Sequence, residues 1–160
     1  MQTVNKIVDL PKAKQLVNEW KTKGEEIVFS NGCFDILHVG HVDYLEKSRQ
    51  QGDRLVIGLN TDRSVSLIKG PSRPIVDQYS RARIIAAMEF VDLVVLFDEE
   101  TPLNLITELS PSILVKGKDY NISNIVGADF VLKHGGKVET IELTAGFSST
   151  NVINNILKIK

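Results

Sequence analysis

Apolar residues follow two alternating patterns along this chain. Short runs of mostly Val, Ile and Leu predict strands buried on both faces, at residues 27–30, 54–60, 93–97, 113–115 and 138–143. Between them, segments with apolar residues every three or four positions predict helices, at residues 11–22, 42–51, 79–90, 101–110, 125–134 and 148–158. Because strands and helices alternate, we expect an α/β, Rossmann-like single domain with a five-stranded parallel sheet covered by helices on both faces.

Glycine and proline mark the boundaries between these elements. Gly24 ends the first helix, so we expect residues 1–24 to form a helical extension packed on the main domain, residues 25–160. Residues 70–77 contain Pro71 and Pro74 and must form a loop. Parallel sheets bind ligands at the carboxyl ends of their strands. We therefore expect four polar segments that follow strands to converge, namely residues 31–41, 60–62, 116–120 and 144–150.

The segment from Asn31 to His41 carries the strongest chemical signal. It joins a buried strand to a helix start, where free backbone N–H groups and the positive end of the helix dipole bind phosphate. His38 and His41 add side-chain donors, and Gly40 lets a phosphate approach the backbone closely. The pattern predicts that both histidines stabilise the charge that develops when the α-phosphorus of a nucleoside triphosphate is attacked. Two other interpretations are a zinc site completed by Cys33 and histidines that merely begin a helix.

The overall charge argues against a nucleic-acid or membrane partner. The 160 residues include 19 Lys and Arg and 20 Asp and Glu, which leaves a net charge of −1 and no basic stripe. The N-terminus lacks the apolar segment of a secretory signal, and no apolar run has the length of a membrane span. The single cysteine, Cys33, cannot form an internal disulfide. Together these features predict a cytoplasmic protein.

Four motifs together resemble those of the cytidylyltransferase-like nucleotidyltransferases. The mark of that superfamily, Gly-x-Phe-Asp-x-x-His-x-Gly-His, is complete at residues 32–41. Within the superfamily, three further motifs are similar to those of the heptose 1-phosphate adenylyltransferases. They are Lys69-Gly70 with Arg73-Pro74, residues 115–120 and residues 148–151. The similarity extends over nearly the whole chain.

The resemblance implies an enzyme that transfers the adenylyl group of ATP to D-glycero-β-D-manno-heptose 1-phosphate. The products would be pyrophosphate and ADP-heptose for lipopolysaccharide core biosynthesis. It further implies Mg²⁺ carried by the ATP phosphates with no assigned protein ligand, a homodimer, and a standalone enzyme without a fused sugar kinase. Glu89 and Leu143 stand where the related cytidylyltransferases carry arginine, which disfavours cytidylyl transfer. The alternatives are a cytidylyltransferase or FAD-synthase-like enzyme acting on glycerol, ethanolamine or flavin phosphate, and a non-catalytic nucleotide sensor.

Individual residues receive roles from the motifs and the resemblance together. The predicted catalytic residues are His38, His41 and Lys69. The predicted nucleotide-binding residues are Gly32, Cys33, Phe34, His38, Gly40, His41, Gly117, Gly146, Ser149 and Thr150. The predicted substrate-binding residues are Asp35, Lys69, Arg73 and Asp119.

Several of these residues have a second interpretation. Asp35 binds Mg²⁺ or a substrate hydroxyl, or it caps the following turn. Cys33 fits a small packing residue better than a nucleophile, because in-line transfer needs no enzyme nucleophile. Lys69, Arg73 and Arg81 suit a loop that closes over phosphates, but they also fit solvated surface charge. Ser148 or Ser149 fits the N-cap of the last helix, and the resemblance adds phosphate contacts from backbone amides and from Ser149 or Thr150.

Overall fold

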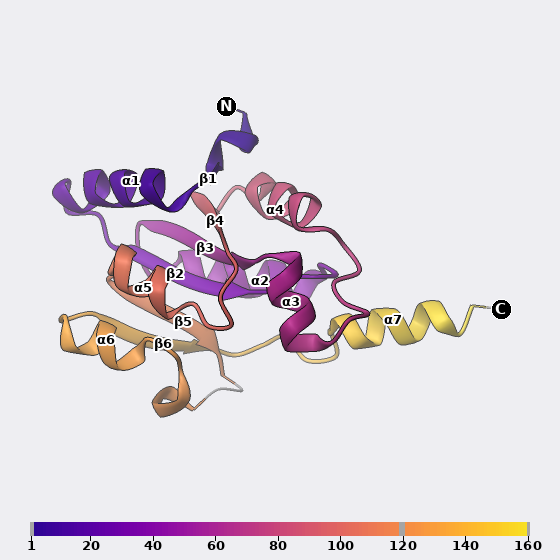
Figure 1. Cartoon of the computed structure of the whole chain (residues 1–160). Coiled ribbons are helices and arrows are strands. Elements are labelled where there is room, and N and C mark those ends of the chain that lie inside the picture. Colours follow the sequence, from indigo (N-terminus) through magenta and orange to yellow (C-terminus); the bar gives the residue numbers. More distant parts are fainter. Residues whose placement is uncertain (1, 119–120, 160) are drawn as a thin grey trace.

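The computed structural model describes residues 2–118 and 121–159, and its centre is a parallel sheet (Figure 1). The sheet has six strands in the order β1-β4-β3-β2-β5-β6. Their bounds are β1 Ile7–Val8, β2 Ile27–Gly32, β3 Arg54–Asn60, β4 Leu93–Phe97, β5 Ile113–Gly117 and β6 Lys137–Ile141. All neighbours pair in parallel, which confirms the predicted Rossmann-like sheet.

The number of strands differs from the prediction of five. Ile7 and Val8 form a sixth strand, β1, which pairs with Val94 and Val95 of β4 at the edge of the sheet. Two apolar residues are too short a run to signal a strand by themselves, and only the neighbouring strand makes them one. Residues 1–24 thus contribute a strand as well as a helix, and the division of the chain at Gly24 stays a prediction.

Within the described residues, seven α-helices connect and flank the strands. They are α1 Leu10–Thr22, α2 Val39–Arg49, α3 Asp62–Lys69, α4 Gln78–Ala87, α5 Leu103–Leu109, α6 Ala128–Lys133 and α7 Ser149–Leu157. Short 3₁₀ turns lie at Thr3–Lys6 and Ile122–Asn124. Helix α3 was not predicted, and its eight residues are fewer than the ten to twelve that identify a helix by periodicity. Its start is fixed locally by Thr61, whose hydroxyl accepts a hydrogen bond from the backbone N–H of Ser64.

Two layers of helices bury the sheet. Helices α1, α5 and α6 pack on one face, where Phe29 of β2 and Ile106 of α5 belong to the same core cluster. Helices α2 and α4 pack on the other face, where Val28 of β2 and Leu45 of α2 share a second cluster. Neighbouring strand residues thus point to opposite faces, as the near-continuous apolar runs require.

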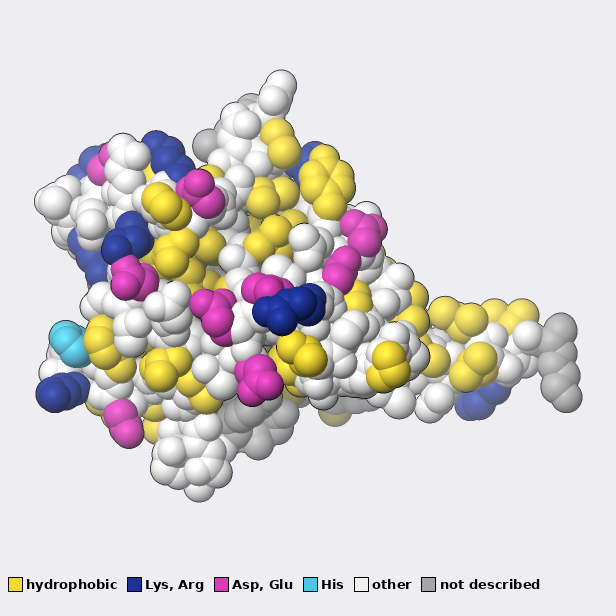
Figure 2. Space-filling view, viewed as in Figure 1, with side chains coloured by type: hydrophobic (Ala, Val, Ile, Leu, Met, Phe, Trp, Pro, Cys, Tyr) yellow, Lys and Arg dark blue, Asp and Glu magenta, His cyan; other side chains and the backbone are white. Residues whose placement is uncertain are grey.

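The strand order reverses direction at β2, which pairs with β3 on one side and β5 on the other. In doubly wound sheets the crevice outside the carboxyl ends of two such strands holds the ligand. Helix α7 lies near this end of the sheet and projects away from the body (Figure 1). Acidic and basic side chains are interspersed over the face shown in Figure 2. Among the helices of the described chain, none is both long and apolar enough to cross a membrane.

Candidate active site

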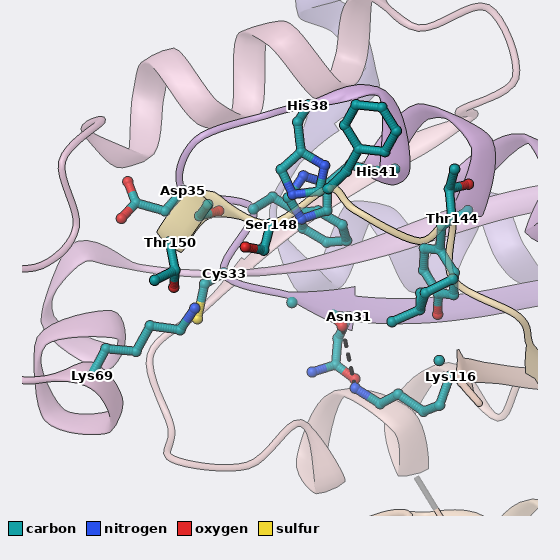
Figure 3. Close-up of a pocket in the computed structure, with 18 residues that line it drawn as sticks. Asn31, Cys33, Asp35, His38, His41, Lys69, Lys116, Thr144, Ser148 and Thr150 are labelled. Carbon is teal, nitrogen blue, oxygen red and sulfur yellow. Dashed lines mark hydrogen bonds between the residues drawn. The ribbon is translucent and has the colours of Figure 1, made fainter. Parts of the chain in front are cut away.

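A cavity of about 380 Å³ opens between the carboxyl ends of β2 and β5 (Figure 3). Three of the four predicted segments line it, namely those beginning at Asn31, Lys116 and Thr144. The predicted site residues in its wall are Gly32, Cys33, Phe34, Asp35, His38, Gly40, His41, Lys69, Gly117, Ser149 and Thr150. Arg73 and Gly146 are not in the wall, and Asp119 lies outside the described residues.

The fourth segment, residues 60–62, converges with the first as predicted, because Sγ of Cys33 donates to Oδ1 of Asn60 at 3.9 Å, but it does not line the cavity. Instead, the side chain of Arg81 binds its polar groups. Its Nη1 donates to the carbonyl oxygen of Asn60 at 2.8 Å, and its Nη2 donates to Oδ1 of Asp62 at 2.7 Å. Arg81 therefore pairs with polar groups at or after the carboxyl end of β3 that lie outside the cavity.

His38 and His41 form a stacked pair at the start of α2. His38 is the N-cap residue with extended backbone angles, and its carbonyl oxygen accepts from the N–H of His41 at 2.9 Å. The ring centroids lie 3.9 Å apart with 25° between the ring planes. Phe34 packs edge-on against His41 with 5.3 Å between centroids. The pair is thus held rigidly by packing, as a preorganised donor site requires.

Both imidazoles are neutral near pH 7. Burial lowers the pKa of His38, and burial, with smaller electrostatic contributions from His38 and Lys69, lowers the pKa of His41 to about 4. Both Nδ1 atoms are buried, and no described residue is a hydrogen-bond partner for them. An Nδ1 without an acceptor favours the tautomer with its proton on Nε2. We therefore assign Nε2–H donors rather than imidazolium cations.

Two glycines allow this packing. A Cβ atom at Gly40 would lie 3.1 Å from Nδ1 of His38 and 3.3 Å from Cβ of Phe147, and one at Gly32 would lie 3.0 Å from the ring of Phe34. These distances are tighter than ordinary side-chain contacts. In this structure the requirement for glycine at both positions comes from neighbouring side chains. The predicted approach of phosphate to Gly40 stays a prediction.

Asp35 holds the proline-containing loop against the motif. Its buried carboxylate accepts from the backbone N–H of Ile75 at 2.8 Å and of Val76 at 2.9 Å, and from Nε of Arg73. Burial alone would raise the pKa of Asp35, but the hydrogen bonds from Val76, Arg73 and Ile75 outweigh it and lower the pKa. Asp35 and Arg73 bind each other here, so their predicted contacts with substrate remain a prediction.

Arg81 is a fully buried guanidinium that joins three segments. Besides Asn60 and Asp62, it binds the carbonyl oxygen of Cys33 at 2.6 Å through Nη1 and that of Val76 at 2.9 Å through Nε. Its donors are directed at protein oxygens, not into the cavity. The interpretation of Arg81 as a phosphate-gripping or surface cation is therefore wrong, because its planar guanidinium donates hydrogen bonds to protein oxygens at or after the ends of β2 and β3.

Lys69 and Cys33 lie together at one side of the cavity (Figure 3). Lys69 is the last residue of α3, which places its ammonium within electrostatic range of His41. Burial raises the pKa of the Cys33 thiol, although Lys69 and Arg81 oppose that change. A protonated thiol is a poor nucleophile, which agrees with the interpretation of Cys33 as a packing residue.

The start of α7 forms the opposite wall. Ser148 caps the helix by accepting from the N–H of Asn151 at 3.0 Å, and the hydroxyl of Ser149 donates to the carbonyl oxygen of Ile36 at 3.2 Å. Gly146 has a φ of +86°, which turns the chain into the helix. Ser148 is thus the N-cap, and Ser149 ties α7 to the histidine motif. Phosphate contacts of Ser149 and Thr150 stay predictions.

Several wall residues carried no assigned role in the sequence. They are Asn31, Tyr44, Lys116, Leu143, Thr144 and Phe147. Nζ of Lys116 donates to the carbonyl oxygen of Asn31 at 3.2 Å, which joins the ends of β5 and β2 (Figure 3). Asn31 and Lys116 could have been predicted as wall residues, because each lies at the carboxyl end of a strand. Tyr44 follows His41 by three positions, and that spacing places it on the same helix face.

A protein-held metal does not fit these residues. Within residues 2–118 and 121–159, no three His, Cys, Asp or Glu side chains form a group that could hold a metal ion. The zinc interpretation of Cys33 with the two histidines therefore lacks a suitable donor set. The carboxylate of Asp35 already accepts three hydrogen bonds, so it has little capacity left for Mg²⁺.

The arrangement offers uncharged N–H donors, a lysine and two helix starts around one cavity. Such groups bind phosphate oxygens and stabilise charge on them without forming a covalent bond. The geometry suits transfer of a phosphoryl or nucleotidyl group between two bound ligands.

Comparison with known proteins agrees with this geometry. The cytidylyltransferase-like family model matches residues 29–155. A bifunctional protein HldE from Magnetococcus marinus is 51% identical over 152 residues, which are 95% of this chain and 31% of that protein. A bifunctional protein HldE from Gluconobacter oxydans is 49% identical over 156 residues, which are 98% of this chain and 33% of that protein. The chain thus spans about a third of the length of these curated relatives.

Two solved structures share the fold. A lipopolysaccharide core biosynthesis protein from Thermoplasma volcanium is 30% identical with a TM-score of 0.58, covering 75% of this chain and 97% of that one. Pantothenate synthetase from Thermus thermophilus has a TM-score of 0.63 over 92% of this chain and 67% of that one. At 17% identity the second similarity concerns the fold alone.

Proposed function

The chain belongs to the cytidylyltransferase-like family, and from this membership we propose that it transfers the adenylyl group of ATP to a sugar 1-phosphate. The proposed acceptor is D-glycero-β-D-manno-heptose 1-phosphate, and the products are ADP-heptose and pyrophosphate. The observation that carries the proposal is the stacked His38–His41 pair at a helix start, inside the cavity at the point where the strand order reverses.

The proposed reaction is an in-line displacement. An oxygen of the sugar phosphate attacks the α-phosphorus of ATP, and the bond from that phosphorus to the bridging oxygen of the β-phosphate breaks. The attacking oxygen is already ionised near neutral pH, so no general base is needed. The Nε2–H groups of His38 and His41 and the ammonium of Lys69 would stabilise the charge on the α-phosphate and on the departing pyrophosphate.

The divalent ion belongs to the nucleotide in this proposal. Mg²⁺ would enter with the ATP phosphates and neutralise part of their charge. The substrate contacts proposed for Gly117, Ser149 and Thr150 follow from their place in the cavity wall. Those proposed for Asp119, Arg73 and Gly146 rest on the motif resemblance alone.

The named relatives support the choice of acceptor. The Thermoplasma relative is a lipopolysaccharide core biosynthesis protein, and this chain covers 97% of it. ADP-heptose is a donor suited to that assembly. A cytoplasmic location, where ATP and sugar phosphates occur, and a homodimer complete the proposal.

The decisive test is a product assay with matched substrates. Purified protein is incubated with ATP or CTP and with heptose 1-phosphate, glycerol 3-phosphate, ethanolamine phosphate or flavin mononucleotide. Pyrophosphate release and product mass are recorded. We expect ADP-heptose from ATP and heptose 1-phosphate. Turnover of CTP with glycerol 3-phosphate alone would reject the heptose assignment.

The variant His41→Ala separates an enzyme from a nucleotide sensor. Loss of one preorganised donor lowers turnover by about 10²–10³ in comparable sites. His134→Ala is the matched control, because His134 follows α6 and binds the carbonyl oxygen of Phe130 outside the cavity. Equal product formation by wild type and His41→Ala would contradict the catalytic role.

A further inference from the structure

The sheet is split where the cavity lies. Pairing between β2 and β5 ends at Phe29 and Leu114. Beyond that point β2 continues beside β3 as far as Gly32, and β5 continues beside β6 as far as Gly117. The cavity therefore begins as a gap between two strands of the same sheet, and the groups that bridge this gap set its width.

Tyr44 of α2 bridges the first position of the gap. In the register of the paired residues, Ser30 of β2 and Val115 of β5 would be the next pair. The Tyr44 hydroxyl donates to the carbonyl oxygen of Val115 at 3.1 Å, and its oxygen lies 2.8 Å from the hydroxyl oxygen of Ser30. Because the tyrosine proton points to Val115, the Ser30 hydroxyl is the donor in the second bond. One phenolic oxygen thus joins α2 to both strands.

A second side chain bridges the next position. Asn31 and Lys116 follow in register, and Nζ of Lys116 donates to the carbonyl oxygen of Asn31 at 3.2 Å (Figure 3). This bridge begins and ends on the strands, so it links β5 to β2 without involving α2. Tyr44 is therefore the bridge that ties the helix to the gap.

The bridge made by Tyr44 is buried. Tyr44 and Ser30 both lie in the interior, and within the described residues Tyr44 is the one side chain of α2 that hydrogen-bonds to β2 or β5. Leu45 of α2 packs on the same face of the sheet in an apolar cluster with Val28. Apolar packing is non-directional, whereas hydrogen bonds require a narrow range of distance and angle. The hydroxyl of Tyr44 thus fixes the position of α2 over the gap.

The same helix carries the histidine pair. His38 caps α2, and His41 precedes Tyr44 by three residues, a rise of about 4.5 Å along the helix. Both histidines line the cavity together with Gly117 of β5. A displacement of α2 relative to β5 would therefore move the imidazoles relative to the opposite side of the gap. A misplacement of about 1 Å can lower the rate of an aligned reaction by about 10²-fold.

We propose that Tyr44 is a positioning residue, whose hydroxyl holds the histidine pair in place across the split between β2 and β5. The catalytic part of this inference rests on the proposed function, because that function gives His38 and His41 their task. The Tyr44 hydroxyl binds protein groups, so it acts on the reaction through the position of α2.

The test replaces Tyr44 with phenylalanine, which removes one oxygen and keeps the ring. Steady-state kinetics with ATP and heptose 1-phosphate give kcat and both KM values, and circular dichroism gives the folded fraction at the assay temperature. We expect kcat per folded protein to fall by about 10- to 100-fold, because alignment is lost. Both KM values should stay within about threefold of wild type, because the groups that bind the substrates remain.

Two variants serve as controls. Tyr79→Phe makes the same chemical change on α4, where Tyr79 is exposed and outside the cavity wall, so kcat should be unchanged. Ser30→Ala keeps the bond from Tyr44 to Val115, so we expect kcat to fall by less than about threefold. A loss in Ser30→Ala as large as that in Tyr44→Phe would overturn the role of the bond between α2 and β5.

A spectroscopic measurement tests the position of the histidines without substrate. The chain has three histidines, and His134 lies outside this cavity. In NMR spectra of the imidazole protons, we expect Tyr44→Phe to shift the resonances of His38 and His41 and to leave those of His134 in place. A loss of stability alone would not shift the resonances of the folded protein. Unchanged resonances of His38 and His41 would overturn the positioning role.

The outcomes separate this inference from the proposed function. If wild type is active and Tyr44→Phe retains its kcat per folded protein, the inference is overturned while the proposed function stands. A raised KM for ATP with unchanged kcat would place the hydroxyl against the nucleotide and overturn the inference too. A wild type that makes no nucleotide sugar, together with shifted histidine resonances in Tyr44→Phe, would overturn the proposed function while the structural assignment of Tyr44 stands.

Discussion

Replacing Arg81 with lysine tests whether this buried guanidinium organises the site or binds substrate. The side chain is fully buried and donates to the carbonyl oxygens of Cys33, Asn60 and Val76 as well as to Asp62. Lysine keeps the positive charge but has a single nitrogen in place of the planar fork. The perturbation therefore removes geometry and leaves charge.

The magnitude follows from the oxygens that lose their donor. A lysine ammonium at the place of Nη1 can serve the carbonyl oxygens of Cys33 and Asn60, but the carbonyl oxygen of Val76 then loses its Nε–H donor. A buried carbonyl without a partner costs about 1–3 kcal/mol, which predicts a loss of at least that size in the free energy of unfolding. Since small domains unfold with about 5–15 kcal/mol, the variant should be folded but clearly destabilised.

Urea unfolding measures this loss directly. The single tryptophan, Trp20, packs against the α1/α5/α6 core layer and reports unfolding by its fluorescence. Arg83→Lys is the matched control, because Arg83 lies on the same helix and donates one bond, to Thr3 at 3.3 Å. We expect the control to change stability by less than about 0.5 kcal/mol.

The activity of Arg81→Lys completes the argument. Cys33 belongs to the motif that carries His38 and His41, and in the variant its carbonyl oxygen loses the guanidinium that holds it. We expect the resulting displacement of this segment to lower kcat more than it raises the KM for ATP. A stability loss below about 1 kcal/mol, combined with a raised KM for ATP and unchanged kcat, would refute the reasoning. That result would mean that the guanidinium contacts phosphate rather than the protein backbone.

Three further predictions concern charge in and around the cavity. Since burial lowers the pKa of His38 and that of His41 falls to about 4, kcat/KM should show no inflection near pH 6.5; an inflection there that disappears in His41→Asn would show that an imidazolium is required. Lys69→Met should lower kcat/KM for ATP by about 10²-fold, because it removes a cation from the cavity wall. Lys137→Met should leave kcat/KM unchanged, because Lys137 begins β6 and does not line this cavity, and equal values for the two variants would contradict the catalytic role of Lys69. The lowered pKa of Asp35 means that its carboxylate stabilises the fold above the unfolded-state pKa and that this contribution is lost as the pH falls through the lower folded-state value. Acid unfolding monitored by circular dichroism should therefore show a weaker pH dependence in Asp35→Asn, and an unchanged profile would contradict the hydrogen bonding described for it.

Local patterns in the chain determined most of the architecture. Apolar runs such as Arg54–Asn60 predicted strands at their observed places, because a strand buried on both faces must be apolar almost throughout. The turn from β2 into α2 was equally readable, since it joins a buried strand to a helix start carrying His38 and His41. These features depend on residues that are close together in the chain, so the sequence alone predicts them.

Only the tertiary structure decided which partner each long side chain takes. Ile7 and Val8 form a strand because β4 lies beside them, and Arg81 binds carbonyl groups because three loops meet around it. Likewise, Asp35 binds the proline-containing loop about forty positions later in the chain. An arginine or aspartate has the same donors or acceptors in a cavity and in a buried network, so sequence spacing cannot distinguish the two. Burial and the position of distant backbone groups make that choice, and both exist only after the chain has folded.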